Sequence, residues 1–411
     1  MPSNLLRACA LMALAGVAAL CAEPFITRTE LFEGGQGGYK LYRIPGIVVT
    51  KDGTILVYCE ARKFTGGDWD TIDVEMRRST DGGLTFSAPD VIAHVTVPIT
   101  RSPVAIERKQ GKVTDVTYNN PVAIPDRNGL VHFLFCIDYM RVFYMRSSDD
   151  GKTFTPPVEI TSAFDAFRPE YAWRVVATGP GHGTQLSNGR LVVPVWLSLG
   201  TQGNGHGPSV NSTVYSDDHG ATWHRGEIAV PDTAEFPKPN ETNAVQLADG
   251  RVMLNVRTAG KNRRTIVISK DGATKWSQPH LQEDLPDPIC FASLVRLSTR
   301  KSGGKNRLLF SNPDNLSRQD GKDLPGKDRK NLTVRVSYDE GASWTVKKAL
   351  EPGVAGYSDL AVLPDGTILC FYETGSAAPP NGALTRQLML ARFNLEWLTD
   401  GSDSLAKGKK H

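Results

Sequence analysis

The octet Ser79-Thr80-Asp81-Gly82-Gly83-Leu84-Thr85-Phe86 decides the fold, because edited copies of it recur four more times along the chain. The copies begin at Ser147, Ser216, Ser269 and Ser337, and successive starts lie 68, 69, 53 and 68 residues apart. Their shared pattern is Ser-x-Asp-x-Gly-x-Thr/Ser-aromatic, which the fourth copy follows more loosely. Self-similarity at such a spacing is typical of a repeat architecture rather than of one irregular domain.

Each octet predicts a hairpin turn. An Asp carboxylate accepts hydrogen bonds from backbone N–H groups just ahead of it, Gly takes a positive φ, and the flanking hydroxyls bond locally. The terminal Phe or Trp is expected to face the core as an apolar plug.

A second repeat interleaves with the octets, and it consists of an Asp-Gly or Asn-Gly turn followed by an alternating apolar strand. Its copies are 52–57, 128–133, 188–193, 249–254 and 365–370, and the segment 303–310 fills the remaining gap. Six units of about sixty residues, each holding roughly four short strands, predict an all-β, six-bladed β-propeller. A solenoid is the rival, but the chain offers no long segment of helical periodicity to form its second element.

Composition sets limits on the function. The chain has 411 residues with a formal net charge of +3 and no basic stripe with interleaved aromatics, which argues against nucleic-acid binding. Its 39 Gly and 26 Pro favour many turns. We expect one catalytic propeller domain over 23–399, a long surface loop at 313–330, and a basic, frayed tail at 400–411.

Residues 1–22 resemble an export signal: Arg7 precedes an uncharged apolar run from Ala8 to Leu20, and Ala22 is the expected cleavage residue. The run is too short for a comfortable membrane span, so we expect a periplasmic or secreted protein. Lipoprotein anchoring through Cys21 is an alternative, although Leu20 is a poor residue before a lipid-carrying cysteine.

The four cysteines beyond this segment lie in apolar, strand-like runs and read as small buried hydrophobes: Cys59, Cys136, Cys290 and Cys370. Their spacing suggests neither a disulfide framework nor a metal site, and His182 has no second His at ligand spacing. We therefore expect no metal and no cofactor. The Gly-rich segment 179–184 opens no helix, so a turn is expected there rather than a phosphate loop.

Several polar residues interrupt the apolar strands where loops of a propeller would converge on its centre. They are Tyr42-Arg43-Ile44-Pro45, Glu60-Ala61-Arg62-Lys63, Gly66-Gly67-Asp68-Trp69-Asp70, Asn240-Glu241-Thr242-Asn243, Asn255-Val256-Arg257, Arg329 and Gly356-Tyr357-Ser358. With the octets, these motifs resemble the bacterial exo-α-sialidases (neuraminidases), six-bladed propellers in which the octets are called Asp boxes or BNR repeats. The resemblance covers roughly residues 25–398.

The resemblance implies three arginines that bind the sialic acid carboxylate, and by motif they are Arg43, Arg257 and Arg329. Guanidinium groups stay charged and offer forked donors that match a carboxylate. Three such charges together would repel one another without an anion. Arg318 and Arg335 lie near Arg329 in the sequence and are alternatives for the third position.

The resemblance also implies that Tyr357 is the nucleophile and Glu241 its base. A phenol has an ordinary pKa of about 10, so a carboxylate must take its proton during attack. Tyrosine suits an anomeric carbon that already carries a carboxylate, because an Asp or Glu nucleophile would approach against that charge; sialidases are the tyrosine exception among glycosidases.

Asp68 matches the acid/base of the family, and Asp70 competes with it because the local sequence departs from the usual motif. Arg62 resembles a pocket arginine near the sugar 4-hydroxyl; alternatively it only pairs with Asp68 or Asp70. Trp173 is either part of the pocket for the N-acetyl group or, more simply, a core aromatic.

The predicted function is that of a retaining, metal-independent exo-sialidase acting on terminal α-linked sialic acids of glycoproteins, glycolipids and oligosaccharides, mucin-type glycans included. We expect a monomer with no membrane span. A non-catalytic sialic-acid-binding propeller and a sialyl-transferring or anhydro-product enzyme are the alternatives. The lectin alternative would need the arginines but not Tyr357, Glu241 or an Asp near position 68.

Overall fold

The computed structural model describes residues 22–318, 320–322, 326–376 and 385–405. The segment expected to be an export signal, with Cys21, lies outside the described residues except for Ala22, as does the end of the predicted tail. None of the helices in the described part of the chain is long and apolar enough to cross a membrane.

The chain is all-β in architecture, and the strands of its described residues form five sheets that resemble propeller blades. The first three sheets in chain order are β2–β5, β6–β9 with β11, and β10 with β12–β15. Their strands are β2 (Leu41–Val49), β3 (Ile55–Arg62), β4 (Ile72–Ser79), β5 (Asp90–Val91), β6 (Tyr118–Pro125), β7 (Val131–Ile137), β8 (Arg141–Ser147), β9 (Val158–Glu159), β10 (Val175–Thr178), β11 (Gly181–His182), β12 (Thr184–Gln185), β13 (Leu191–Gln202), β14 (Gly207–Ser216) and β15 (His224–Arg225).

The fourth sheet has four strands and the fifth has seven, in the order β1-β25-β24-β23-β22-β21-β20. These strands are β16 (Thr242–Gln246), β17 (Val252–Val256), β18 (Arg263–Ser269), β19 (His280–Pro286), β20 (Ser293–Ser298), β21 (Arg307–Pro313), β22 (Lys330–Ser337), β23 (Val346–Val362), β24 (Ile368–Ser376), β25 (Thr385–Phe393) and β1 (Ile26–Glu33). Four short helices complete the described chain: α1 (Pro103–Glu107), α2 (Thr161–Asp165), α3 (Arg300–Gly303) and α4 (Leu395–Leu398).

The long strand β23 joins what the repeats predict as two separate blades. Its first part, Val346 to Val354, pairs with β22, and its second part, Ala355 to Val362, pairs with β24. Five sheets are therefore seen where six separate ones are expected.

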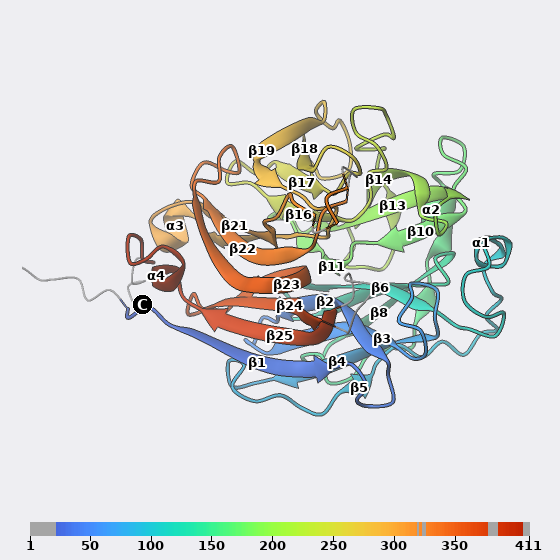
Figure 1. Cartoon of the computed structure of the whole chain (residues 1–411), viewed down its shortest axis with the longest axis horizontal. Coiled ribbons are helices and arrows are strands. Elements are labelled where there is room, and N and C mark those ends of the chain that lie inside the picture. The colour runs from blue at the N-terminus through green and yellow to red at the C-terminus, as the bar shows by residue number, and fades with distance from the viewer. Residues whose placement is uncertain (1–21, 319, 323–325, 377–384, 406–411) are drawn as a thin grey trace, which may run out of the picture.

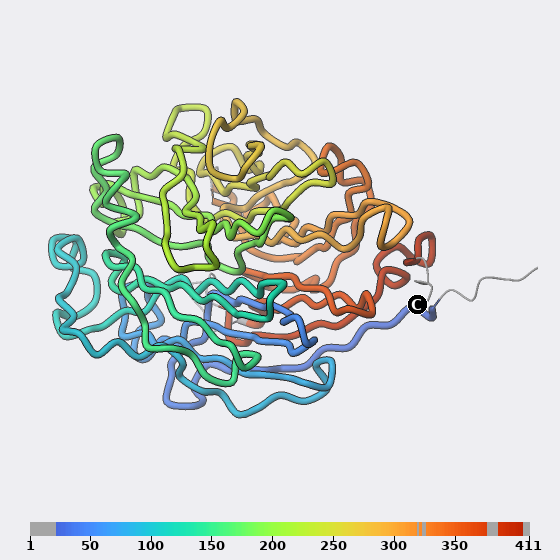
Figure 2. Tube along the Cα trace, turned by 180° about the vertical axis from the view of Figure 1, so that it is seen from behind, coloured from blue at the N-terminus to red at the C-terminus, as the bar shows by residue number. Residues whose placement is uncertain are grey.

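The sheets follow one another around a centre in chain order, and the first strand closes the ring (Figure 1). Strand β1 pairs antiparallel with β25, so the two ends of the domain lie side by side, as the view from behind also shows (Figure 2). Inner strands of neighbouring sheets are in contact, including β2 with β6 and β23, and β20 with β16; within the seven-stranded sheet, β20 also contacts β23. They surround a cavity of about 470 Å³ lined by residues such as Ile47, Ile124, His182, Val295 and Leu360.

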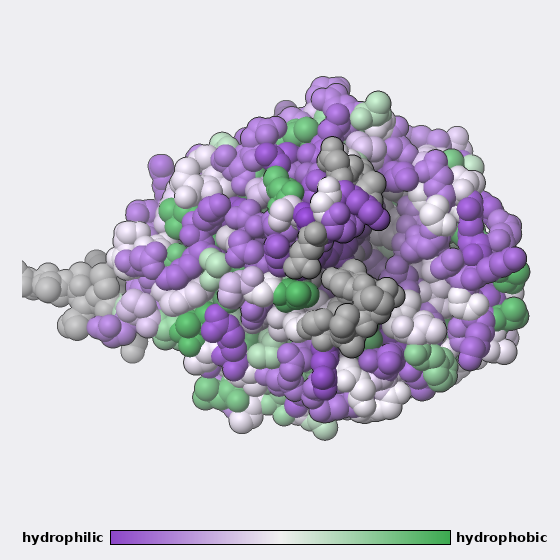
Figure 3. Space-filling view, viewed as in Figure 1, coloured by the Kyte–Doolittle hydropathy of each residue, from purple (hydrophilic) through white to green (hydrophobic). Residues whose placement is uncertain are grey.

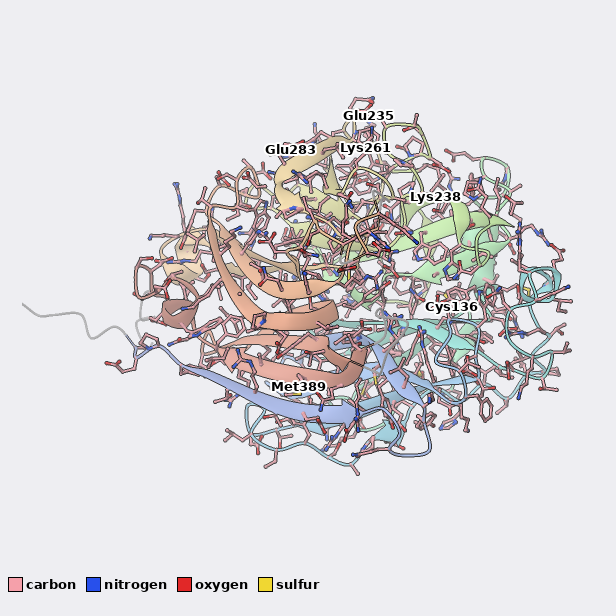
Figure 4. All side chains as sticks on the ribbon, in the orientation of Figure 1. Cys136, Glu235, Lys238, Lys261, Glu283 and Met389 are labelled. Atoms are coloured by element: carbon pink, nitrogen blue, oxygen red, sulfur yellow. The ribbon has the colours of Figure 1, made fainter. Side chains whose placement is uncertain are left out.

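Apolar side chains from facing sheets fill the space between them in seven buried clusters. The four cysteines predicted to be buried hydrophobes are buried and free, which confirms that interpretation; Cys136 is labelled among the strands in Figure 4. The face seen in Figure 3 is mostly hydrophilic, with hydrophobic residues scattered over it.

The octets form the turns that the sequence predicts. In the first, Ser79 donates to Asp81 Oδ1 at 2.8 Å, the amide of Thr85 donates to the same oxygen at 3.0 Å, and the Thr85 hydroxyl donates to Oδ2 at 2.6 Å. The same hydroxyl-to-carboxylate bonds recur at Asp149, Asp218, Asp271 and Asp339. Each octet links the third strand of a sheet to the fourth.

The terminal aromatics follow the prediction to different degrees. Trp223 and Trp344 are buried, whereas Phe86, Phe154 and Trp276 are half-buried against the apolar clusters. The Asp-Gly and Asn-Gly turns also form as expected, because Gly53, Gly129, Gly189, Gly250 and Gly366 all have positive φ.

The predicted frayed tail is wrong in its first residues. Asp403 is 8% exposed and accepts hydrogen bonds from Arg307 at 2.7 and 2.8 Å. It also accepts one from Tyr338 at 2.7 Å and one from Lys305 at 3.0 Å. A buried carboxylate held by two cations anchors the chain beyond residue 400, so this part belongs to the fold.

Candidate active site

The predicted site residues lie at one end of the sheets. Arg43 is near the start of β2, Arg62 ends β3, Glu241 immediately precedes β16, Arg257 follows β17, and Arg329 precedes β22. In an antiparallel sheet, the start of the first strand lies at the same end as the end of the second strand and the start of the third. The octets and the Gly turns lie at the opposite end of the strands. The repeated motifs and the motifs that occur once are therefore separated in space.

Tyr357 is the centre of the arrangement. Its side chain is 5% exposed, and its hydroxyl donates to Glu241 Oε1 at 2.5 Å. Arg257 Nη1 donates to the Tyr357 oxygen at 2.9 Å and also to Glu241 Oε2. The phenol is therefore bonded to a carboxylate that can take its proton and to a cation that can stabilise its negative charge.

Two more arginines face the Tyr357 ring. The guanidinium carbon of Arg43 is 5.1 Å from the ring centroid and that of Arg329 is 5.3 Å. Burial and the charge of Glu241 raise the pKa of Tyr357 well above its ordinary value, while Arg257, Arg329 and Arg43 act in the opposite direction. The tyrosine is thus neutral and has three positive charges around it.

The three predicted carboxylate-binding arginines come together, and the alternatives to Arg329 do not. Arg318 pairs with Asp320 on the surface, and Arg335 is buried on Asp314 and Asn312. Arg329 alone of these faces Tyr357, and it also donates to the Ile289 carbonyl at 2.6 Å.

The expectation that the triad needs an anion to relieve its repulsion is only partly right. Arg43 is paired with Glu373, donating through Nε at 3.0 Å and Nη2 at 3.2 Å, and Arg257 is paired with Glu241. Two of the three charges are thus balanced within the protein. The described contacts of the Arg329 guanidinium are a carbonyl and the Tyr357 ring.

Glu373 is a site residue that the sequence reasoning missed. It is 1% exposed and accepts hydrogen bonds from the amides of Ile44 at 3.1 Å and Tyr357 at 3.0 Å as well as from Arg43. Burial alone would raise its pKa, but the charge of Arg43 and these bonds hold it below its ordinary value. The signal was an acidic residue at the end of the apolar run Leu369-Cys370-Phe371-Tyr372.

The structure separates Asp68 from Asp70. Asp70 Oδ2 accepts from the amides of Phe64 and Gly66 at 2.9 Å each and from that of Thr65 at 2.5 Å, so it organises the loop. Asp68 is half-buried, and its Oδ1 accepts from Arg62 at 2.8 Å. Among the described contacts, the donors to the Asp68 oxygens are side chains, Arg62 on Oδ1 and Asn204 on Oδ2, whereas backbone amides surround Asp70.

Arg62 is 1% exposed and bonds Glu60 as well as Asp68, which matches the pairing alternative; sugar binding by Arg62 stays a prediction. Burial would raise the pKa of Asp68, but Arg62, His206 and Arg43 hold it well below its ordinary value. The sequence assigned no role to Glu60, yet its carboxylate accepts hydrogen bonds from Arg62 and holds the guanidinium in place.

Other predicted residues have structural roles. Trp173 is fully buried and donates to the Phe164 carbonyl at 2.8 Å, which confirms a core aromatic. His182 donates to Asp359 at 2.8 Å. The segment 179–184 contains the short strand β11 and the first residue of β12, and it opens no helix, as expected. Among the described residues, no group of three or more His, Cys, Asp or Glu side chains is placed to hold a metal ion.

Residues 102–370, more than half of the chain, match the family model described as a BNR repeat-like domain. The chain belongs to this BNR repeat-like family. A sialidase of Micromonospora viridifaciens is 31% identical over 403 residues, which cover 92% of this chain and 55% of the relative. A sialidase of Bacteroides fragilis is 28% identical over 371 residues, covering 84% of this chain and 62% of the relative.

Among solved structures, the Hadza microbial sialidase Hz136 aligns with a TM-score of 0.68 at 23% identity, covering 88% of this chain and 67% of that one. This likeness supports the fold of the BNR repeat-like chain. The relatives confirm the predicted resemblance to sialidases, while this chain spans less than two thirds of the length of both curated relatives.

Proposed function

We propose that this protein is a retaining exo-α-sialidase that releases terminal α-linked sialic acid from glycans through a covalent tyrosyl intermediate. The observation that carries the proposal is the hydrogen bond of 2.5 Å from Tyr357 to Glu241 beneath Arg43, Arg257 and Arg329. A buried tyrosine with its own base and three cations suits a substrate whose reacting carbon carries a carboxylate.

In the first half of the reaction, the arginines bind the substrate carboxylate next to Tyr357. The Tyr357 oxygen attacks the anomeric carbon while Glu241 takes the phenolic proton. Asp68 donates a proton to the glycosidic oxygen, the bond to the aglycone breaks, and the sugar is left attached to Tyr357. In the second half, Asp68 takes a proton from water and the water oxygen attacks the anomeric carbon. The bond from that carbon to the Tyr357 oxygen breaks, and Glu241 returns its proton to the released Tyr357 oxygen.

The low pKa of Asp68 fits this scheme once the charge of the substrate is considered. The pKa is held down partly by Arg43, one of the carboxylate-binding cations. A bound carboxylate would offset the charge of Arg43 and exclude water, and both changes favour the protonated form of Asp68. Substrate binding would therefore raise the pKa of Asp68 and favour the protonated form that acts as the acid.

The proposal includes several features beyond the chemistry. We infer six blades, since β23 would serve as the outer strand of one blade and the inner strand of the next. We also propose that residues 1–22 direct export, that the protein is a monomer, and that its activity does not depend on a metal. The proposed substrates are glycoproteins, glycolipids and mucin-type glycans.

The decisive experiment compares wild type with Tyr357→Phe on a fluorogenic sialoside. We expect turnover by wild type and a loss of more than about a hundredfold in kcat for the variant. Tyr372→Phe is the matched control, because Tyr372 is an equally buried tyrosine in the core on β24, and it should keep near-normal activity. Full activity of Tyr357→Phe contradicts the mechanism, and binding without turnover by wild type favours the lectin alternative.

A further inference from the structure

The turn between β13 and β14 touches the carboxylate proposed as acid/base. Asn204 at its tip donates from Nδ2 to Asp68 Oδ2 at 3.2 Å. The backbone carbonyl of Asn204 accepts from Trp69 Nε1 at 2.8 Å. One residue of this turn therefore binds both Asp68 and the side chain next to it.

The turn is shaped to bring Asn204 to this position. It runs from Gln202 to Gly207, and Gly203 and Gly205 on either side of Asn204 have positive φ. A Cβ at Gly205 would lie 2.8 Å from Val104 and 3.3 Å from the Trp69 ring, so the backbone approaches closely only because a glycine stands there. The contact with Asp68 comes from a tightly packed turn.

The main chain of the Asp68 loop is fixed separately. Asn119 donates to the Asp68 carbonyl at 3.3 Å, Arg101 to the Trp69 carbonyl at 2.7 Å, and Thr117 to the Asp70 carbonyl at 2.6 Å. Arg101 is itself buried, and its Nη1 forms an ion pair with Asp138 Oδ1 at 2.8 Å. With the backbone held, the orientation of the Asp68 carboxylate depends on its side-chain partners, Arg62 on Oδ1 and Asn204 on Oδ2.

These two partners differ chemically. A guanidinium can only donate, so Arg62 keeps Oδ1 as an acceptor, and a catalytic proton on Asp68 must reside on Oδ2. An amide can donate through its nitrogen or accept through its oxygen, so Asn204 can bond Oδ2 in either protonation state. Asn204 thus faces the oxygen that would exchange a proton with the glycosidic oxygen.

We propose that Asn204 is a positioning residue that holds Oδ2 of Asp68 in line for proton transfer to the leaving group. This inference rests on the proposed function. It predicts that Asn204 matters most when the leaving group needs a proton. An aryl sialoside with an acidic phenol departs with little help, whereas the lactose of sialyllactose requires protonation.

The test measures kcat/KM on 4-methylumbelliferyl sialoside and on 3′-sialyllactose for wild type and Asn204→Ala. We expect the variant to lose roughly tenfold or more on sialyllactose and less than about threefold on the aryl substrate. Gln202→Ala is the control, because Gln202 is an exposed residue of the same hairpin. Melting temperatures identify variants that are merely destabilised.

Asn204→Asp is the second variant and is nearly isosteric. The charged or titratable groups facing Asp68 are Arg62 and Glu60 of β3, Arg43 of β2, Tyr139 after β7, and His206 of the same turn. A new carboxylate opposite Oδ2 disfavours the ionised form of Asp68, so the basic limb of kcat on sialyllactose should move to higher pH.

Equal losses on both substrates with an unshifted pH profile would show a structural role only and overturn the inference, as would unchanged activity of both variants. Failure of wild type to cleave either substrate overturns the proposed function and the role of Asn204 with it. Turnover by wild type with no leaving-group dependence of Asn204→Ala overturns the inference alone.

Discussion

Carboxylates at the two ends of the sheets are held in opposite ways. At the octet end, Asp81 is bonded by Ser79, Leu84 and Thr85, all within four residues of it in the chain. At the site end, Glu373 is bonded by Arg43 and Ile44, which lie 330 and 329 residues away. The first carboxylate is exposed and the second is buried.

The difference shows which part of the molecule is determined by its local sequence. A local hydrogen-bonded turn forms wherever its octet occurs, so it can repeat in sheet after sheet. A buried ion pair between distant strands exists only when the ring has closed, and each such pair is unique. A motif that repeats therefore indicates a structural role in this protein, and a motif that occurs once indicates a residue of the candidate site.

Replacing Glu373 by Gln should have the largest effect of the changes considered below. It leaves the Arg43 charge buried without its counter-ion, which costs about 3–5 kcal/mol when a buried pair is broken. Under the proposed function, Arg43 would also lose its orientation toward the substrate carboxylate. We expect a large fall in the free energy of unfolding and a raised KM for sialosides in the protein that still folds, measured by denaturant unfolding and steady-state kinetics.

Glu159→Gln is the matched control for Glu373→Gln. Arg141 bonds Glu159 through Nε at 3.0 Å and Nη2 at 2.6 Å, the same fork as in the buried pair, but at the surface. Its loss should cost at most about 1 kcal/mol and leave KM unchanged. Similar losses in the two variants would remove the contrast between site and surface carboxylates.

The scaffold was largely predictable from sequence because its signals are local. The octets and the Asp-Gly or Asn-Gly turns fix the ends of strands, and both form as expected. The joining of two blade-like units by β23 was not predictable. The segment 346–362 contains Pro352-Gly353, which reads as a break, yet the strand continues with a shift of partner from β22 to β24.

The candidate site was predictable only where a motif marked it. The motifs indicated Tyr357, Glu241 and Arg43, whereas the proposed choice of Asp68 over Asp70 needed the backbone amides that surround Asp70. Glu373 and Asn204 were missed, because each contacts a partner far away in the chain. No spacing in the sequence reports which strands become neighbours around a closed ring.

His182 lies between the octet end and the site end of the sheets, and its ion pair with Asp359 can be compared with the carboxylates at both ends. Its ring bonds Asp359 at 2.8 Å, two residues beyond Tyr357 on β23. Burial alone would lower the pKa of His182, but the charge of Asp359 and its hydrogen bond raise it overall. A raised folded-state pKa stabilises the fold fully below the unfolded value of about 6.5, and that contribution is lost as pH rises through the folded-state pKa.

We therefore expect His182→Gln to destabilise the protein by on the order of 1 kcal/mol at pH 5 and by less at pH 9. Thermal or denaturant unfolding of wild type and variant at each pH gives the difference, which removes the titration of all other groups. His280→Gln is the control, since His280 is exposed on β19. A difference that grows with pH would contradict the assigned charge on His182.

Asp81→Ala should have the smallest effect and should leave the site intact. The variant loses the bonds to Ser79 and Thr85, so the first octet weakens while four other copies remain. Hydrogen bonds from the Thr85 side chain and amide and from Ser79 hold the pKa of Asp81 below its ordinary value. Its contribution to stability is thus present above the unfolded pKa of about 3.9 and is lost as pH falls through the lower folded-state value.

The measurement for Asp81→Ala is a melting curve at neutral pH together with KM for a sialoside. We expect a melting temperature lower by about one degree and an unchanged KM, because the octet lies at the opposite end of its sheet from Arg43. Asp165→Ala, which removes a carboxylate from an exposed ion pair with Arg168, is the control and should melt like wild type. A large rise in KM for Asp81→Ala would mean that the turn reaches the site through β4 and the Asp68 loop, and that scaffold and chemistry are not separate in this protein.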